Sequence, residues 1–240
     1  MPLRFWIFAS ISLIPSLVYA DPTPSNPSVW TSSAELGASM ATGNSQNTNV
    51  NAKLKIKYHH EPWTNRLRLE TLQASENGTS TANRTLADFE SHYSLNERNY
   101  VFGSTRASRD SFSGYNYQMN AAAGLGHRFW LSDRGSFTLE LGPGFRRSQQ
   151  QTGETHNNLI ARTNGDFVYQ FSELGKFEQE LTVLAGRNNT ELESVTSLSA
   201  SMTKKLAMKL SYTILHNSQV PANKKRTDTF TSVNLVYQFE

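Results

Sequence analysis

Hydrophobic and polar side chains alternate with a period of two residues along most of the chain. The clearest segment is 49–58, in which the hydrophobic positions interleave with three lysines: Val50, Ala52, Leu54, Ile56 and Tyr58 alternate with Asn49, Asn51, Lys53, Lys55 and Lys57. A helix would scatter these lysines around its axis, whereas a strand points them all to one face and the hydrophobic side chains to the other. The segment is therefore predicted to be a β-strand with one apolar and one charged face.

The same alternation recurs to the end of the sequence. The predicted strands are 30–40, 49–58, 66–70, 87–95, 100–104, 115–125, 137–146, 159–171, 177–185, 192–202, 206–214 and 232–239. The alternation is shorter and weaker in 100–104, where we assign Tyr100 and Phe102 to the apolar face. In 115–125 we assign Tyr115 to the apolar face. Most of the segments have the roughly ten residues that a tilted transmembrane strand needs. The pattern predicts an all-β protein: a transmembrane antiparallel up-and-down β-barrel of about 12 strands, with 10 as the alternative.

The connections between these strands alternate in length. Short connections are predicted at 60–64, 96–99, 132–135, 172–176 and 204–205, and mostly longer polar ones at 43–47, 75–83, 107–114, 148–157, 187–190 and 216–225. Outer-membrane barrels have short periplasmic turns and long external loops. With both termini on the periplasmic side, the first connection is external. The mostly longer connections are then all external and the short ones all periplasmic, as expected for such a barrel.

A soluble β-sandwich would also show alternation. Its strands would usually be shorter, about five or six residues. Aromatic residues also gather near the predicted strand ends, where an interfacial girdle belongs. These are Trp30, Tyr58, Trp63, Tyr93, Tyr100, Phe129, Trp130, Phe171, Tyr237 and Phe239. We therefore favour the membrane barrel.

The first twenty residues differ from the rest. Arg4 precedes an apolar run from Phe5 to Val18, and Val18-Tyr19-Ala20 has the small side chains of a signal-peptidase site. The interpretation is a signal peptide at 1–20, with an uncleaved anchor as the alternative, then a periplasmic leader at 21–29 and the barrel at 30–240. The expected location is the bacterial outer membrane.

Composition excludes several classes of function. There is no cysteine, so disulfides and thiolate metal sites are excluded. A net charge of +3 is too small to indicate a nucleic-acid partner. We expect no cofactor and no metal. The expected partners are outer-membrane lipid and lipopolysaccharide, around a monomer.

The end of the chain resembles an assembly signal of outer-membrane barrels. Val233, Leu235, Tyr237 and Phe239 alternate up to the last residue but one. This pattern resembles the terminal strand that the barrel-assembly machinery recognises, with Tyr237 and Phe239 as its aromatic residues. The final residue here is Glu240 instead of the aromatic itself.

The opening of the predicted barrel resembles a known family. Glu35-Leu36-Gly37, then Thr42-Gly43-Asn44-Ser45, then an Asn- and Lys-rich strand at 49–58 follow one another. This order is similar to that of the YdiY-like salt-induced outer-membrane proteins. The resemblance implies an outer-membrane barrel linked to salt stress, and it implies no catalytic residue because that family has no agreed activity.

If the apolar face meets lipid, the other face lines the interior. The candidate lumen-lining residues are Glu35, Lys53, Lys55, Lys57, Arg66, Arg68, Glu70, Asp88, Glu90, Arg146, Arg162, Asp166, Glu178 and Glu180, and His92, Arg128 and Glu140 share their parity. Two interpretations stay open. The charges either pair across a narrow, largely filled lumen, or form a polar channel whose Lys53, Lys55, Lys57, Arg66 and Arg68 attract anions.

An enzyme acting on envelope lipid is the alternative function. Nucleophilic hydrolysis needs a serine, a histidine and an orienting group within reach of one another. The six histidines are dispersed over predicted turns, loops and the lumen face, and no serine has a recognisable motif around it. The sequence therefore predicts a non-enzymatic envelope barrel with a structural or small-solute channel role.

Overall fold

The computed structural model describes residues 29–42, 48–76, 79–110, 115–220 and 225–239. The signal peptide and most of the leader predicted at 1–29 lie outside these residues. Within them, no helix is long and apolar enough to cross a membrane.

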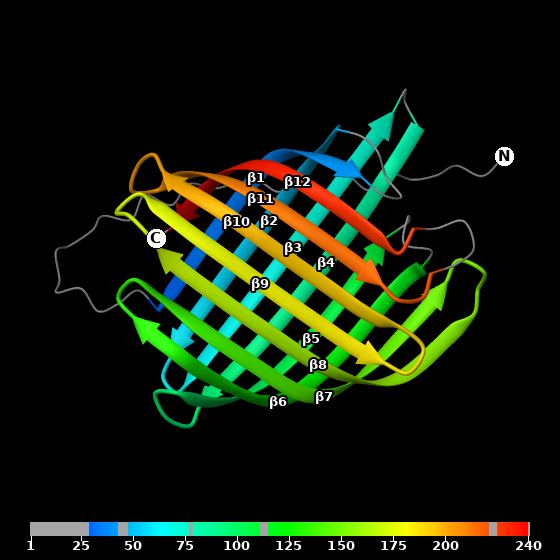
Figure 1. Ribbon diagram of the computed structural model, residues 1–240, viewed down its shortest axis with the longest axis horizontal. Helices are drawn as coiled ribbons and strands as arrows, with labels where there is room; N and C mark the ends of the chain where they lie inside the picture. The colour runs from blue at the N-terminus through cyan, green and yellow to red at the C-terminus, as the bar shows by residue number, and fades with distance from the viewer. Residues whose placement is uncertain (1–28, 43–47, 77–78, 111–114, 221–224, 240) are drawn as a thin grey trace, which may run out of the picture.

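Twelve antiparallel strands form one closed barrel (Figure 1). The strands are β1 (Trp30–Thr42), β2 (Thr48–His60), β3 (Trp63–Glu76), β4 (Thr79–Ser94), β5 (Asn99–Asp110), β6 (Tyr115–Ser132), β7 (Gly135–Gln150), β8 (Thr155–Gln170), β9 (Gly175–Gly186), β10 (Thr190–Ser201), β11 (Leu206–Asn217) and β12 (Thr227–Phe239). Each strand pairs with its neighbours in sequence, and β1 closes the sheet against β12 with Leu36 opposite Leu235. The prediction of an up-and-down barrel of twelve strands is confirmed.

Closure leaves no unpaired sheet edge, which a barrel in hydrocarbon requires because lipid offers no hydrogen-bond partner to backbone groups. The even strand number brings the start of β1 and the end of β12 to one end of the barrel. We call this the terminus end; it also carries connections 61–62, 95–98, 133–134, 171–174 and 202–205. The opposite end, with connections 43–47, 77–78, 111–114, 151–154, 187–189 and 218–226, is the loop end.

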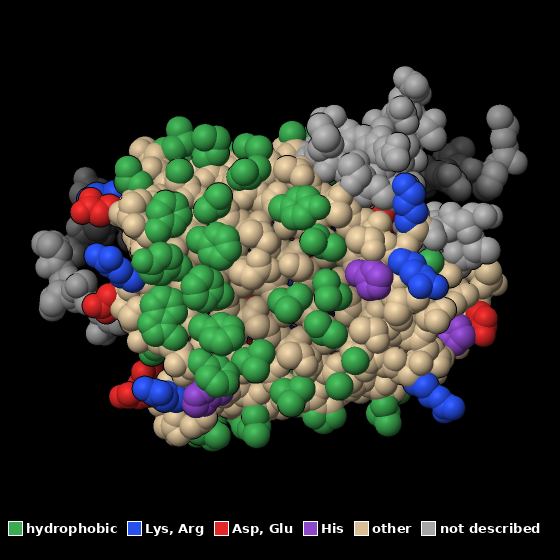
Figure 2. All heavy atoms as spheres, in the orientation of Figure 1, with side chains coloured by type: hydrophobic (Ala, Val, Ile, Leu, Met, Phe, Trp, Pro, Cys, Tyr) green, Lys and Arg blue, Asp and Glu red, His purple; other side chains and the backbone are tan. Residues whose placement is uncertain are grey.

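The outer face is apolar. Leu36, Leu125 and Leu141 are more than 60% exposed, although each belongs to a central part of its strand. Figure 2 shows hydrophobic side chains gathered over the part of the face nearer the terminus end, with mostly polar surface toward the loop end. Lipid is the medium in which such a surface is stable.

Aromatic rings pack on the outer face near the terminus end. Trp30 lies 4.5 Å from Tyr58, and Trp63 lies 5.0 Å from Tyr93, between ring centroids. A register shift between Arg128 and Trp130 in β6 is accompanied by a ring contact of Trp130 with Phe167 on β8, 5.9 Å away. These rings form a belt at the level expected for a membrane interface.

The strands are longer than predicted, from 12 residues in β5 to 18 in β6. The segment 75–83, predicted to be a loop, belongs almost entirely to β3 and β4, with only 77–78 between them. Residues 107–110 likewise continue β5. Only about 9–11 residues of a strand are needed to cross the hydrocarbon. The polar residues at the loop end therefore belong to the part of each strand that extends beyond the lipid, where the sheet continues.

Two assignments of facing were wrong. Tyr100 and Phe102 are 2% and 3% exposed and lie inside the barrel, while Val101 between them is on the outer face. The reason is local packing: a Cβ on Gly126 would meet the Tyr100 ring at 2.2 Å, so glycine there leaves room for an aromatic ring in the lumen. Tyr115 is also buried, beside a register shift in β6.

A charge introduced on the outer face tests the lipid contact. We expect Leu141→Arg to lower the free energy of unfolding by about 2–4 kcal/mol, because the guanidinium would face hydrocarbon near mid-strand. Unfolding by urea of the barrel in lipid vesicles, followed by tryptophan fluorescence, measures it. Asn157→Arg is the matched control, because Asn157 is exposed near the loop end of β8; an equal loss in both variants would contradict the assigned lipid band.

Candidate functional site: the ion-paired lumen

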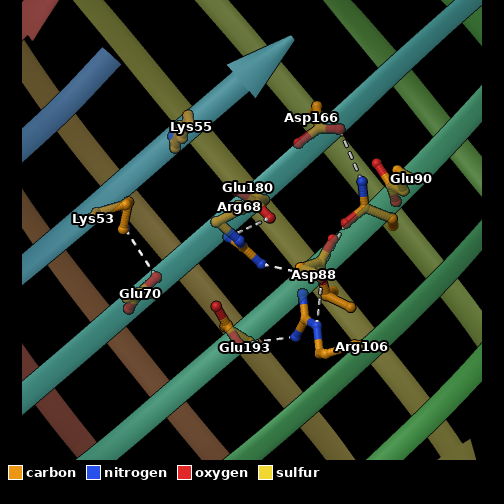
Figure 3. A network of polar contacts seen from close by, with 12 residues as sticks. Lys53, Lys55, Arg68, Glu70, Asp88, Glu90, Arg106, Asp166, Glu180 and Glu193 are labelled. Carbon is orange, nitrogen blue, oxygen red and sulfur yellow. Dashed lines mark hydrogen bonds and ion pairs between the residues drawn. The ribbon is translucent and has the colours of Figure 1, made fainter. Parts of the chain in front are cut away.

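Eight charged side chains form a continuous series across the middle of the lumen. In order they are Lys53, Glu70, Arg84, Glu193, Arg106, Asp88, Arg68 and Glu180, and we call this series the central chain. Basic and acidic residues alternate strictly along it, four of each. It joins β2, β3, β4, β5, β9 and β10, so it spans the barrel from wall to wall (Figure 3).

The two shortest contacts of the central chain are both made by Arg106. Arg106 Nε lies 2.7 Å from Asp88 Oδ2, and its Nη1 lies 3.1 Å from Glu193 Oε2. Arg68 bridges Asp88 at 3.5 Å and Glu180 at 3.3 Å. Pairs such as Arg106–Glu193 join strands that are not neighbours in the sheet, so these contacts cross the lumen.

Two further groups lie nearer the terminus end. In one, Lys209 contacts Glu35 at 3.4 Å and Glu178 at 3.6 Å, while Lys55 reaches Glu35 at only 3.9 Å. In the other, the Arg162 guanidinium binds Glu140, 2.6 Å from its Oε2, and also Glu90.

The remaining predicted lumen residues are placed as follows. Asp166 accepts a hydrogen bond of 2.8 Å from Asn164. Arg146 lies near the loop end, where it donates to the carbonyl oxygen of Asn189 at 2.6 Å. For Lys57 and Arg66, no ion pair is found with any described residue.

Four members of these groups, Arg84, Arg106, Glu193 and Lys209, were not among the candidate residues predicted from the sequence. Arg84 lay next to a segment predicted to be a loop, and the fifth strand was ended before Arg106. Glu193 and Lys209 were on the polar parity of their strands but were not chosen. Continuing the period-two pattern of β4 to its true end at Thr79 would have included Arg84. Arg106 shares the parity of Tyr100 and Phe102, so placing it in the lumen also required reversing the facing assigned to that strand.

A cavity of about 550 Å³ opens between the central chain and the terminus end, and we call it the vestibule. Its charged lining residues are Lys55, Lys57, Arg66, Arg68, Arg106 and Arg162 with Asp88, Glu90, Asp166, Glu178 and Glu180. A second cavity of about 410 Å³ shares Lys55 and Glu178 with it. The lumen is thus hollow toward the terminus end and crossed by charged side chains in its middle.

The burial of these charges explains why they pair. Glu140, Arg146 and Glu35 are at most 3% exposed. A buried charge without a partner loses hydration that nothing replaces, so each requires an opposite charge or several hydrogen bonds. The inward parity of twelve strands therefore determines a network, although the individual partners depend on how the barrel closes.

Comparison with known proteins places this barrel in a family. Residues 34–239 match the family described as "Protein of unknown function, DUF481". The chain belongs to the DUF481 family. One similar protein is the uncharacterized protein YdiY of Escherichia coli strain K12. It is 25% identical over 199 residues, which cover 82% of this chain and 78% of YdiY.

Solved structures similar to this DUF481 chain include porins and an outer-membrane channel. The NanC porin has a TM-score of 0.59 at 13% identity, covering 85% of this chain and 98% of NanC. The KdgM porin, solved in complex with disordered oligogalacturonate, has 0.51 at 18% identity, over 87% and 99%. The COG4313 outer-membrane channel of Pseudomonas putida F1 has 0.52 at 10% identity, over 92% and 100%. At these identities the likeness shows the fold: an outer-membrane-type β-barrel.

Removing one buried cation tests the network. We expect Arg162→Met to lower the free energy of unfolding by about 3–5 kcal/mol, because Glu90 and Glu140 would lose their shared partner while they stay buried. Lys57→Met is the control; Lys57 is exposed and unpaired, so its loss is expected to stay within about 0.5 kcal/mol. Urea unfolding in vesicles measures both, and equal stability of the two variants would contradict the pairing.

Proposed function

We propose that this protein is a narrow outer-membrane channel for small anionic solutes, with the central chain as its constriction. The observation that carries the proposal is the vestibule, which ends at the central chain and contains two cations, Lys57 and Arg66, without an ion pair among the described residues. Unpaired cations in a confined, low-dielectric space raise the local concentration of anions. The alternating charges of the central chain provide polar groups for a partly dehydrated solute.

The porin and channel folds of the similar structures support a transport role over a catalytic one. The histidine contacts support it too: among the described residues, His59, His127 and His216 have hydrogen-bonding side-chain partners in Thr64, Asn99 and Thr227, and none bonds to a serine. The nucleophile and base of a hydrolase would need such a contact.

Several further expectations belong to the same proposal. The signal peptide directs export, and Tyr237 and Phe239, 43% and 46% exposed on β12, contact the barrel-assembly machinery. The barrel then functions as a monomer in outer-membrane lipid and lipopolysaccharide. A role in salt stress, implied by the family resemblance, would appear as a growth defect of a deletion strain in high salt.

Charge reversal at the vestibule tests the anion preference. In planar bilayers with a salt gradient, we expect the wild-type protein to give small current steps with a reversal potential that indicates anion preference. Lys57→Glu with Arg66→Glu should shift the reversal potential toward cation preference, since it changes the charge of the vestibule from slightly positive to negative. Arg187→Glu with Lys204→Glu, in exposed turns, is the matched control and should shift it far less. No current at any voltage would remove the channel and leave a structural barrel.

Removing a pair from the central chain tests the constriction. We expect Arg106→Ser with Glu193→Ser to raise single-channel conductance at least about twofold, since it removes two large side chains from the lumen and leaves no single charge in excess. Thr105→Ser with Leu198→Ala, on the outer face of the same strands, is the control. Unchanged conductance in the lumen variant would place the constriction elsewhere.

A further inference from the structure

A buried histidine and two buried glutamates converge in the lumen beside the vestibule. Glu90 and His92 come from β4 and Glu140 comes from β7, and the three are 8%, 3% and 1% exposed. One ligand-type atom from each, the histidine nitrogen and a carboxylate oxygen of each glutamate, lies within 4.8 Å of the others. These residues are not part of the central chain.

Arg162 determines which carboxylate oxygens face the histidine. Its guanidinium binds Oε1 of Glu90 and Oε2 of Glu140. The other oxygen of each carboxylate, Oε2 of Glu90 and Oε1 of Glu140, lies near His92 Nε2, at 3.5 and 3.3 Å. The arginine therefore holds one oxygen of each glutamate toward the same nitrogen.

The Nε2 atom of His92 is buried and has no hydrogen-bond partner, because neither carboxylate contact has hydrogen-bond geometry. An unsatisfied buried polar nitrogen is rare and costs stability. A lone pair on this nitrogen and two carboxylate oxygens would instead suit a cation placed between them.

The two distances from the histidine nitrogen to the carboxylate oxygens match those of a tetrahedral zinc site. Zinc binds histidine nitrogen and carboxylate oxygen at about 2.0–2.2 Å, so two ligands of a tetrahedron lie about 3.3–3.6 Å apart. The two contacts of His92 Nε2, 3.3 and 3.5 Å, fall in this range. We propose that Glu90, His92 and Glu140 form a binding site for a divalent transition-metal ion of the zinc class inside the lumen.

The surroundings orient the three ligands. The Tyr100 ring stacks on His92 with centroids 4.7 Å apart, and its hydroxyl donates to Glu140 Oε1 at 2.9 Å. Such outer contacts fix the orientation of metal ligands in known sites. Glu90 and Arg162 also border the vestibule, so an ion reaches the site from the terminus end.

Charge is the main argument for the competing occupant, a proton. With His92 neutral, the two carboxylates and Arg162 sum to −1; a second proton on His92 gives 0, whereas a divalent ion gives +1. The metal's advantage is direct bonding to the nitrogen, which the misaligned contacts deny to an N–H donor. Metal binding, measured directly, decides between the two.

The test is metal binding by the purified barrel in detergent, carrying no histidine tag and treated with a chelator. Isothermal titration with Zn²⁺ is expected to give one equivalent bound. Co²⁺ in the same site is expected to give the visible absorption of a four-coordinate ion. His92→Ala should weaken Zn²⁺ binding at least about tenfold and abolish the Co²⁺ absorption, because it removes a direct ligand.

His127→Ala is the matched control, since His127 bonds to Asn99 at 2.7 Å and lies next to Phe129 outside this cluster; it should bind metal as the wild type does. Glu140→Gln, which keeps shape, provides a second variant if His92→Ala fails to fold by circular dichroism. No bound metal in the wild type, or unchanged affinity in both ligand variants, would overturn the proposal. The assay uses no ion current, so it stands or fails separately from the proposed channel.

Discussion

Each side chain in this barrel faces either the hydrocarbon or a narrow lumen, and the backbone between these two environments must be fully hydrogen-bonded. Closing the sheet satisfies the backbone because β12 pairs with β1. Alternation then sends every second side chain inward, so charged residues such as Glu35 and Glu140 are buried. Buried charges require partners. These come both from the neighbouring strand, as Asp88 does for Arg106, and from across the lumen, as Glu193 does.

This constraint links the fold to the candidate site. The central chain lies where side chains from six strands meet, and the vestibule lies where they leave space toward the terminus end. Glycine on the inner face of β6 has a specific part in this arrangement. Without a side chain at Gly126, the Tyr100 ring fits inside the barrel and orients both His92 and Glu140. Charge and shape in the lumen are therefore set together.

The sequence was sufficient for the fold and for the facing of most lumen residues, because the period of two is a local property that needs no knowledge of partners. The sequence was insufficient at positions where the polarity of a residue did not indicate whether it lies in a strand or which face of the strand it occupies. Arg84 follows a polar stretch that resembled a loop but is strand beyond the lipid, and Tyr100 is apolar yet faces inward. The pairing of Arg68 with Glu180, 112 residues apart, depends on how far opposite walls lie from each other, which no local pattern encodes.

A double-mutant cycle between Arg68 and Glu180 tests the central claim most directly, because the pair joins β3 to β9 across the lumen. Unfolding free energies of Arg68→Met, Glu180→Gln and the double variant would be compared with that of the parent protein. Pairing across a desolvated lumen predicts a coupling free energy above about 1 kcal/mol, beyond the range of solvent-exposed pairs. A coupling near zero would contradict the account, because the two side chains would then act as independent, hydrated charges.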